Sequence, residues 1–268
     1  MTRPFIPLIG LGTYPLKGDE CVNAVRSAIE TGIRHVDSAQ MYGNEKAVGL
    51  GVAGCGVPRE KLFIVTKVEP QNLTLQRFAA SVERSVDDLG GPPDLLLIHW
   101  PPADDTFDAM IDALVAAREK GMARSIGVSN FTIAMMQRAQ ARAGGAIICN
   151  QVEFHPLFDQ SRLLAAATAL AITVTAYSPL VRGKAMMHET IQAIAARLQR
   201  PPSEVVLRWI VQQGVAAIPM TRRRENCRSN LNALQFELAA EDMAAISAIG
   251  TRSGRSINPA WMAGRWDD

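Results

Sequence analysis

Short apolar runs alternate with longer amphipathic segments along most of the 268-residue chain. The apolar runs are almost continuously hydrophobic, which is typical of strands that are buried on both faces of a parallel sheet. They predict strands near residues 8–11, 33–37, 62–67, 94–99, 123–128, 147–151, 172–177 and 215–219.

The segments between these runs repeat their apolar residues at helical spacing. They predict helices near residues 19–31, 44–55, 74–89, 106–120, 131–142, 160–170, 188–199 with a partner at 203–213, and 223–234. Parallel strands need crossover connections of this kind. Eight such units in about 250 residues predict an α/β fold, the (β/α)8 TIM barrel. A doubly wound open sheet is the alternative.

Nothing in the composition divides the chain, since no linker rich in Pro, Gly or Ser is present. We therefore expect one barrel domain over residues 1–268. Two segments exceed what a barrel needs: a long loop after strand 7, at 178–187, and an irregular C-terminal tail at 250–268. We expect Trp261 and Trp266 to pin this tail to the barrel. Two interpretations remain, because these rings either pin the tail only or also roof a substrate pocket.

Composition and charge narrow the class of protein. Apolar residues make up 48% of the chain and charged residues 20%, as in ordinary globular proteins. A net charge of +2 is too small to favour nucleic acid or an anionic membrane as a partner. No N-terminal apolar segment and no 18-residue apolar run is present. The cysteines show no metal or redox spacing, which predicts reduced thiols in a cytoplasmic protein.

Polar side chains follow several of the predicted strands, and a barrel would bring those strand ends together at one mouth. Asp37 and Tyr42 follow the second strand, Lys67 the third and His99 the fourth. A nearby ammonium lowers the pKa of a tyrosine, and a buried lysine needs a carboxylate partner. His99 can donate a hydrogen bond to a carbonyl group or relay a proton.

Together these four groups would protonate a carbonyl oxygen while its carbon is attacked. None of the four is an obvious strong nucleophile and no metal-ligand set surrounds them, so a hydride from a nicotinamide cofactor fits best. An aldolase that uses Lys67 for a Schiff base is an alternative. It leaves unexplained Gln151 and Tyr177, which are polar side chains at the ends of the sixth and seventh predicted strands.

Ordered sequence blocks from about Leu8 to the C-terminus resemble the aldo-keto reductase family. The blocks are Gly32–Ala39, Tyr42–Glu45 with Val48-Gly49, Thr66-Lys67, Leu97–Pro101, Gly127–Phe131, Asn150–Glu153 and Ala176–Leu180. Within the family, the chain is most similar to the bacterial 2,5-diketo-D-gluconate reductases of the shorter B type. This similarity rests on Val57–Arg59, Asn130–Ile133 and the ending Trp266–Asp268.

The resemblance implies an oxidoreductase that reduces small carbonyl substrates: aldehydes, 2-oxoaldehydes such as methylglyoxal, keto sugars or keto sugar acids. It implies Tyr42 as general acid in a tetrad with Asp37, Lys67 and His99. Cofactor contacts are implied for Thr13, Ser129, Asn130, Gln151, Tyr177, Ser178, Leu180, Thr221 and Asn230. An NADP-binding regulatory protein of the same fold with negligible turnover is the alternative, and the complete tetrad argues against it.

The choice of cofactor depends on residues 218–226. Related families usually have Lys-Ser after Ile-Pro and an arginine five residues later, where this chain has Met220, Thr221 and Asn226. Arg222 and Arg224, with the arginine between them, could bind a phosphate dianion and favour NADP(H) over NAD(H). These arginines could also be a solvated helix start. A cation cluster there opposes the helix dipole unless an anion is near.

The substrate mouth departs from the related reductases at Glu69, where they often have tryptophan. A carboxylate makes this wall polar or anionic, which weakens the expectation of anionic sugar acids as substrates. Tyr14 and Trp100 are the expected aromatic walls. No interface pattern is evident, so we expect a monomer.

Some motifs have simpler interpretations. The G-x-G-x-x-G match at 49–54 follows a helical segment rather than a strand, and it predicts close helix packing. We expect His35, His155 and His188 to be structural or exposed. Glu45 is either a helix-start carboxylate or a buried brace near the site.

Overall fold

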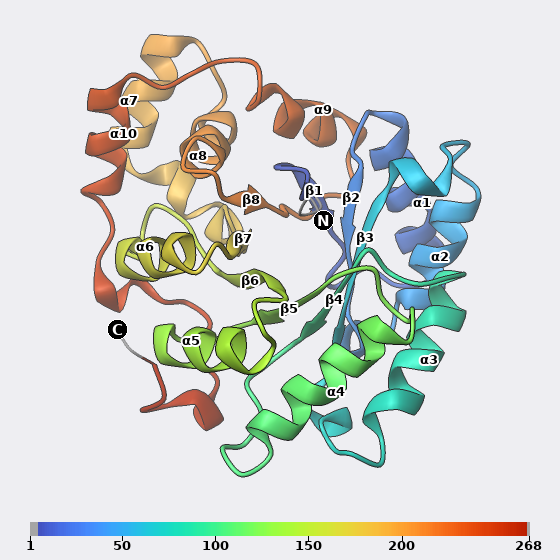
Figure 1. Cartoon of the computed structure of the whole chain (residues 1–268). Coiled ribbons are helices and arrows are strands. Elements are labelled where there is room, and N and C mark those ends of the chain that lie inside the picture. The colour runs from blue at the N-terminus through green and yellow to red at the C-terminus, as the bar shows by residue number, and fades with distance from the viewer. Residues whose placement is uncertain (1–4, 267–268) are drawn as a thin grey trace.

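Eight parallel strands form the centre of the computed structural model, which describes residues 5–266 (Figure 1). Each strand pairs with the next along the chain, in the order β1 to β8. The strands are β1 (Gly10–Gly12), β2 (His35–Asp37), β3 (Phe63–Val68), β4 (Leu95–Ile98), β5 (Ile126–Ser129), β6 (Ile147–Glu153), β7 (Thr173–Tyr177) and β8 (Ala216–Ala217). The predicted (β/α)8 TIM barrel is confirmed.

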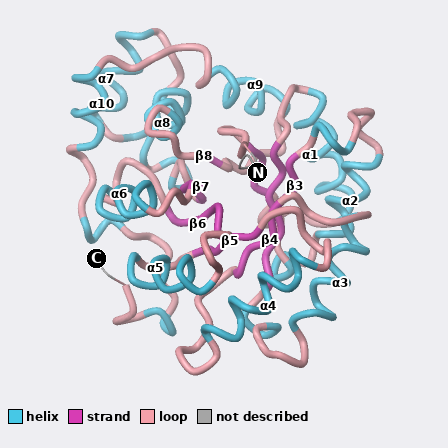
Figure 2. The backbone as a smooth tube through the Cα atoms, viewed as in Figure 1, coloured by secondary structure: helices cyan, strands magenta, loops and turns pink. Residues whose placement is uncertain are grey.

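Helices enclose the strands, as the coloured tube in Figure 2 shows. They are α1 (Gly18–Glu30), α2 (Glu45–Ala53), α3 (Phe78–Leu89), α4 (Phe107–Glu119), α5 (Ile133–Arg142), α6 (Ser161–Ala169), α7 (Glu189–Leu198), α8 (Pro202–Val211), α9 (Arg224–Asn232) and α10 (Ala240–Ser247). Every predicted helical segment contains a helix. The sequence did not predict α10, because only Asp242 and Ile246 of that helix are buried and it lacks an apolar stripe.

Strand β8 closes the barrel against β1. The backbone N–H of Ala217 donates to the carbonyl of Leu8 at 2.7 Å, and that of Gly12 donates to the carbonyl of Pro219 at 3.3 Å. A Cβ atom at Gly12 would lie only 2.6 Å from the carbonyl oxygen of Ile218, so this approach requires glycine. The alternative of an open doubly wound sheet is therefore wrong.

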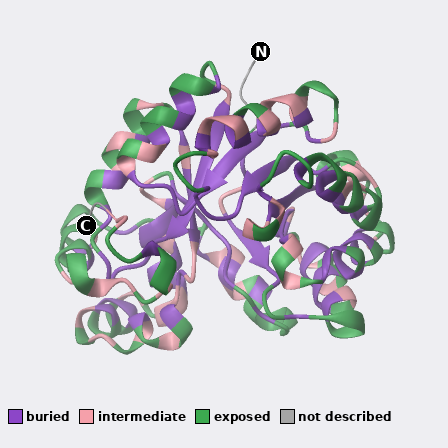
Figure 3. Ribbon diagram, turned by 90° about the horizontal axis from the view of Figure 1, so that it is seen from below, coloured by how far each residue is buried: buried purple, intermediate pink, exposed green. Residues whose placement is uncertain are grey.

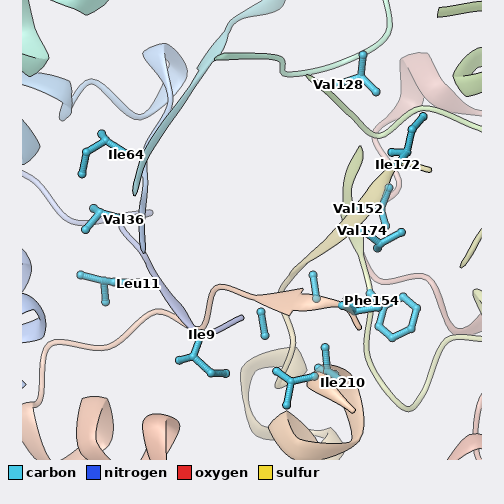
Figure 4. Close-up of a cluster of buried hydrophobic side chains, with 14 of the residues drawn as sticks. Ile9, Leu11, Val36, Ile64, Val128, Val152, Phe154, Ile172, Val174 and Ile210 are labelled. Atoms are coloured by element: carbon cyan, nitrogen blue, oxygen red, sulfur yellow. The ribbon is translucent and has the colours of Figure 1, made fainter. Parts of the chain in front are cut away.

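Buried apolar side chains lie on both sides of the strands. One cluster fills the barrel interior: Ile6, Phe63, Val65, Leu95, Leu97, Ile148, Cys149 and Ala216. A second layer lies between the strands and the helices, where Figure 4 shows Leu11, Val36 and Ile64 on the outer side of their strands. Figure 3 shows the strands buried and the outer helix faces exposed. Burial on both faces explains the continuous apolar runs of the sequence.

The two segments beyond the basic barrel have short helical turns. The loop at 178–187 contains 3-10 turns at Val181–Gly183 and Ala185–Met187, and the tail contains two more at Arg252–Gly254 and Ala260–Met262. The last two residues of the predicted tail, 267–268, lie outside the described residues. Within residues 5–266, the four cysteines are unpaired. No helix there has the length and apolar character needed to cross a membrane.

Candidate active site

The four residues predicted to act together lie at the carboxyl ends of three neighbouring strands. Asp37 ends β2, Lys67 is next to last in β3, and His99 directly follows β4. Tyr42 ends the 3-10 turn Gln40–Tyr42 that follows β2. Parallel pairing aligns these strand ends, so residues far apart in the sequence meet at one mouth of the barrel.

Lys67 is fully buried and paired with Asp37. Its Nζ donates to Oδ1 of Asp37 at 2.5 Å and to the carbonyl of Ser38 at 2.7 Å. Burial disfavours the ammonium more than any single neighbour favours it, but the charges and hydrogen bonds of Asp37 and Tyr42 together outweigh burial and raise the pKa of Lys67. A lysine held as an ammonium is a poor nucleophile, so the Schiff-base alternative finds no support in this geometry.

Tyr42 is in contact with the same ammonium. Nζ of Lys67 donates to the Tyr42 hydroxyl at 3.4 Å and lies 4.9 Å from the centre of its ring. Burial raises the pKa of the Tyr42 phenol, and Lys67 opposes this rise. The sequence-based expectation of a lowered tyrosine pKa is therefore wrong in its net direction, because desolvation exceeds the attraction of Lys67.

His99 packs edge-on against Tyr42, with ring centres 5.6 Å apart and planes at 80°. Burial, together with the charge of Lys67, lowers the pKa of His99 well below its ordinary value. The imidazole is therefore neutral at neutral pH. Of the two roles the sequence allowed, this state favours donation of a hydrogen bond to a substrate over relay of a proton from an imidazolium.

A second cluster lies beside these groups, on β5, β6 and β7. Asn130 joins its members: its Nδ2 donates to the carbonyl of His99 at 3.0 Å, and its Oδ1 accepts from the Tyr177 hydroxyl at 2.8 Å. The Ser129 hydroxyl donates to the carbonyl of Gln151 at 2.8 Å. Asn130 and Ser178 have positive φ angles of 62° and 49°, a conformation that is uncommon outside glycine and concentrates at functional sites.

Gln151 connects the second cluster to the first. Its Nε2 donates to Oδ2 of Asp37 at 2.7 Å, while Lys67 occupies the other carboxylate oxygen. Sequence reasoning placed Gln151 and Asp37 in separate groups, because they are 114 positions apart in the chain. Only barrel closure brings them together.

Thr13 is buried and directly follows the carboxyl end of β1. Its hydroxyl donates to the carbonyl of Asp37 at 2.9 Å and accepts from Nδ2 of Asn44 at 3.1 Å. Asn44 also accepts from the Ser38 hydroxyl at 2.7 Å. Sequence reasoning missed Asn44 and Ser38 as parts of this brace, although both lie within the family-like blocks it used.

The arginine segment lies at the start of α9. Thr221 is buried, and its hydroxyl accepts from the backbone N–H of Arg223 at 3.1 Å. Arg222 pairs with Glu20 at 2.5 Å and Arg224 pairs with Glu30 at 2.8 Å, both on α1. These four side chains are about half exposed. The sequence favoured a cofactor phosphate as the anion near this cation cluster. The structure shows that the carboxylates of Glu20 and Glu30 pair with two of its arginines.

The remaining residues predicted for the cofactor lie around the same side of the barrel. Asn230 is buried within α9, whereas Ser178 and Leu180 are partly exposed in the loop after β7. Met220, the residue that departs from the family pattern, is 42% exposed. A thioether is therefore partly exposed where the resemblance led us to expect a lysine.

Aromatic side chains line the outer part of the mouth. The rings of Tyr14 and Tyr42 lie 5.2 Å apart, and Trp100 contacts Trp261 at 5.7 Å and Trp266 at 6.4 Å between ring centres. The tail tryptophans thus pack on the predicted substrate wall. Glu69 lies beside this region, where its Oε1 accepts from Nδ2 of Asn72 at 3.2 Å.

The simpler interpretations of other motifs also agree with the structure. A Cβ atom at Gly49 would overlap the carbonyl of Asp88, and one at Gly51 would meet Val25 at 2.8 Å, so these glycines permit close helix packing. His35 and His155 are buried, and His188 caps α7. Glu45 begins α2 and is also a buried brace that accepts from the Thr66 hydroxyl at 2.5 Å.

Comparisons with known proteins agree with this arrangement. The family model described as the aldo/keto reductase family matches residues 8–251, and the chain belongs to this family of oxidoreductases. It is 40% identical over 266 residues to the methylglyoxal reductase DkgB of Escherichia coli O157:H7, which covers 98% of this chain and 99% of the relative. An aldo-keto reductase of Mycobacterium avium (strain 104) is 39% identical over 251 residues, covering 92% of this chain and 88% of the relative.

Solved structures are similar over nearly the whole chain. A protein assigned as 2,5-diketo-D-gluconic acid reductase B superposes with a TM-score of 0.95 and 37% identity, covering 98% of this chain and 94% of that one. A variant of Gox0644 in complex with NADPH has a TM-score of 0.89 and 33% identity, covering 94% and 93%. The resemblance to the B-type reductases is confirmed.

Proposed function

We propose that this oxidoreductase uses NADPH to reduce small aldehydes, 2-oxoaldehydes such as methylglyoxal, and keto sugars or keto sugar acids, with Tyr42 as the general acid. One observation carries the proposal. Nζ of Lys67 lies 2.5 Å from Oδ1 of Asp37 and 3.4 Å from the Tyr42 hydroxyl, so a single buried ammonium contacts both the carboxylate and the phenol. The similarity to DkgB, named as a methylglyoxal reductase, supports the substrate class.

The surrounding residues fit a nicotinamide cofactor. Ser129, Asn130 and Gln151 present hydroxyl and amide groups suited to a carboxamide, and Tyr177 presents a flat ring beside them. Thr221, Arg222 and Arg224 lie at the start of α9, where the helix dipole and the guanidinium groups favour a phosphate dianion. Bound NADPH supplies the hydride that reduces the carbonyl carbon.

The chain's own groups handle the proton. The raised pKa of Tyr42 keeps its phenol protonated at neutral pH, so the hydroxyl can give its proton to the carbonyl oxygen as negative charge develops there. The ammonium of Lys67 stabilises the phenolate that remains, and Asp37 holds that ammonium in place. Neutral His99 offers an N–H to the same substrate oxygen.

The carboxylate of Glu69 affects which substrate charges the mouth of the barrel can accept. Glu69 directly follows β3, and the neighbouring strand β4 leads to Trp100, so its carboxylate belongs to the same side of the mouth under this proposal. This carboxylate would repel a substrate that carries a negative charge. Uncharged 2-oxoaldehydes are therefore better substrates, under this proposal, than keto sugar acids.

The test is Tyr42→Phe, which removes the hydroxyl and keeps the ring. We expect turnover of methylglyoxal with NADPH to fall roughly 10²–10⁴-fold, while the Kd for NADPH changes little. Tyr14→Phe, which deletes a phenol whose ring lies 5.2 Å away, should lose less than about tenfold. Normal turnover by Tyr42→Phe would sink the mechanism. Tight NADPH binding without turnover of any carbonyl in a broad panel would instead favour a regulatory protein.

A further inference from the structure

Glu153 is a buried carboxylate that the proposed reaction does not use. It is the last residue of β6 and is 0% exposed. Successive strand side chains alternate between faces, so Glu153 lies on the same face as Gln151, one pleat closer to the mouth. A carboxylate in this position requires partners, because burying an unpaired charge is strongly unfavourable.

Most of the partners of Glu153 come from the C-terminal tail. Its Oε1 accepts from the backbone N–H of Ser256 at 2.9 Å and from the Ser256 hydroxyl, and its Oε2 accepts from the N–H of Ile257 at 2.9 Å. Nε2 of His155 lies 2.9 Å from Oε1. Burial alone would raise the pKa of Glu153, but these hydrogen bonds outweigh it and lower the pKa. The carboxylate therefore stays ionised at neutral pH.

The tail residues around this contact, 251–257, also fit closely against the loop after β6. The N–H of Asp159 donates to the carbonyl of Thr251 at 3.0 Å. A Cβ atom at Gly254 would overlap the carbonyl oxygen of Leu157, so the chain passes too close for any other residue. We call residues 251–257 the tail root.

Residues 258–266, the outer tail, are held by fewer polar contacts. Nη2 of Arg265 donates to the carbonyl of Pro102 at 3.0 Å, and Trp266 contacts Asn258 within the outer tail at 2.9 Å. Apolar contacts add to these: Trp261 and Trp266 lie around Trp100, and the Met262 side chain is fully buried. The guanidinium of Arg255, in the tail root, lies 3.6 Å from the centre of the Trp266 ring. Trp261 itself is 58% exposed. The direction in which the outer tail leaves the root therefore determines whether its tryptophans reach the substrate wall.

We propose that Glu153 is a positioning residue that anchors the tail root and thereby sets Trp261 and Trp266 over Trp100 at the substrate mouth. Detaching the root would leave a buried carboxylate without three of its four donors, so the root stays fixed and sets the course of the outer tail. The consequence for specificity rests on the proposed carbonyl reduction. Apolar carbonyl substrates that reach the tryptophans gain binding from the anchored tail, whereas NADPH does not.

The variant Glu153→Gln tests this role with little change in size. Ser256 donates to Oε1 and Ile257 to Oε2, and an amide replaces one of these two acceptor oxygens with a donor NH₂, so one side of the contact is lost. We expect hydrogen exchange at the Ser256 and Ile257 amides to become at least tenfold faster, with exchange in β6 unchanged. With phenylglyoxal as substrate, KM should rise about tenfold and kcat less than threefold. The Kd for NADPH should stay within twofold.

Glu237→Gln is the matched control. Glu237 is exposed and lies between α9 and α10, so this change should alter neither the exchange rates nor the kinetic and binding constants.

Two further variants keep the proposal testable if Glu153→Gln does not fold. Ser256→Ala removes one donor from the tail side, and Gly254→Ala displaces the root from Leu157 without touching Glu153. Both should raise KM for phenylglyoxal in the same direction. Unchanged exchange at residues 256 and 257, or equal losses in NADPH and phenylglyoxal binding, would overturn the proposal. If the wild-type chain reduces no carbonyl, the proposed function fails, whereas the exchange measurement still decides the anchoring.

Discussion

Gln151 donates a hydrogen bond of 2.7 Å to Oδ2 of Asp37, across the barrel from β6 to β2. The other oxygen of Asp37 accepts from Lys67 at 2.5 Å. One carboxylate therefore connects a residue proposed to hold the nicotinamide with the residues proposed to handle the proton. Under the proposed function, this carboxylate would couple cofactor binding to the readiness of the proton donor.

This coupling predicts non-additive effects in a double-mutant cycle. Asp37→Asn and Gln151→Ala should each reduce kcat/KM, and the double variant should lose less than the two single losses combined. The interaction free energy is expected at about 0.5–3 kcal/mol, as for residues in direct contact. Steady-state kinetics with methylglyoxal and NADPH give kcat/KM for the wild type, the two single variants and the double variant. Strictly multiplicative losses would show that the hydrogen bond carries no functional coupling.

The buried ion pair predicts an asymmetric effect on stability. Lys67→Met leaves Asp37 as a buried carboxylate without its cation, which should lower the free energy of unfolding by roughly 3–5 kcal/mol. The double variant Asp37→Asn with Lys67→Met removes both charges and should recover a large part of that loss. Urea unfolding followed by circular dichroism measures the free energy of unfolding of the single and the double variant. A double variant no more stable than Lys67→Met would contradict this account.

The pairing of Arg222 with Glu20 predicts how cofactor preference can be changed. Arg222→Ala should raise KM for NADPH roughly 10–100-fold, because charged hydrogen bonds contribute about 1.5–3 kcal/mol, and should change KM for NADH much less. Glu20→Gln should lower KM for NADPH, since a carboxylate 2.5 Å from Arg222 no longer competes with phosphate. Arg223→Ala is the control, because Arg223 pairs locally with Glu225. Equal shifts for both cofactors would mean that Arg222 does not contact the phosphate.

Burial of His99 predicts a loss of stability in acid. Its folded pKa is lowered well below 6.5, so below about pH 6.5 the unfolded chain binds a proton that the folded chain does not. The free energy of unfolding should therefore fall as the pH drops below about 6.5. His99→Asn should make the free energy of unfolding depend less steeply on pH in this range. Burial also lowers the pKa of His35, so His35 should account for part of the pH dependence that remains. Unfolding titrations at several pH values test it, and an unchanged slope in His99→Asn would refute it.

The fold was largely predictable because the barrel strands are buried on both faces. Runs such as 62–67 and 94–99 had to be strands between helices, and eight of them leave few alternatives. Helix α10 escaped prediction because most of its residues are exposed and its composition carries no apolar stripe. Periodicity reports burial, so an element with little burial gives little signal.

The sequence predicted which residues form the site much better than it predicted the hydrogen bonds between them. Family-like blocks located Asp37, Tyr42, Lys67 and His99, but sequence spacing cannot show that Gln151 contacts Asp37. The raised pKa of Tyr42 was also out of reach, since it depends on how much desolvation outweighs Lys67. Likewise, His155 had no partner in the sequence, and the structure shows it beside Glu153.

The seam between β8 and β1 has a consequence for how the molecule is made. Its hydrogen bonds join Leu8 and Gly12 to Ala217 and Pro219. During synthesis, β1 therefore meets its last neighbour only after strands β2 to β7 have been made. Until then the growing sheet has two open edges, where strands of other chains can pair. A dinucleotide held by Thr13 on one side of this seam and Thr221 on the other would act as a clasp that closes it.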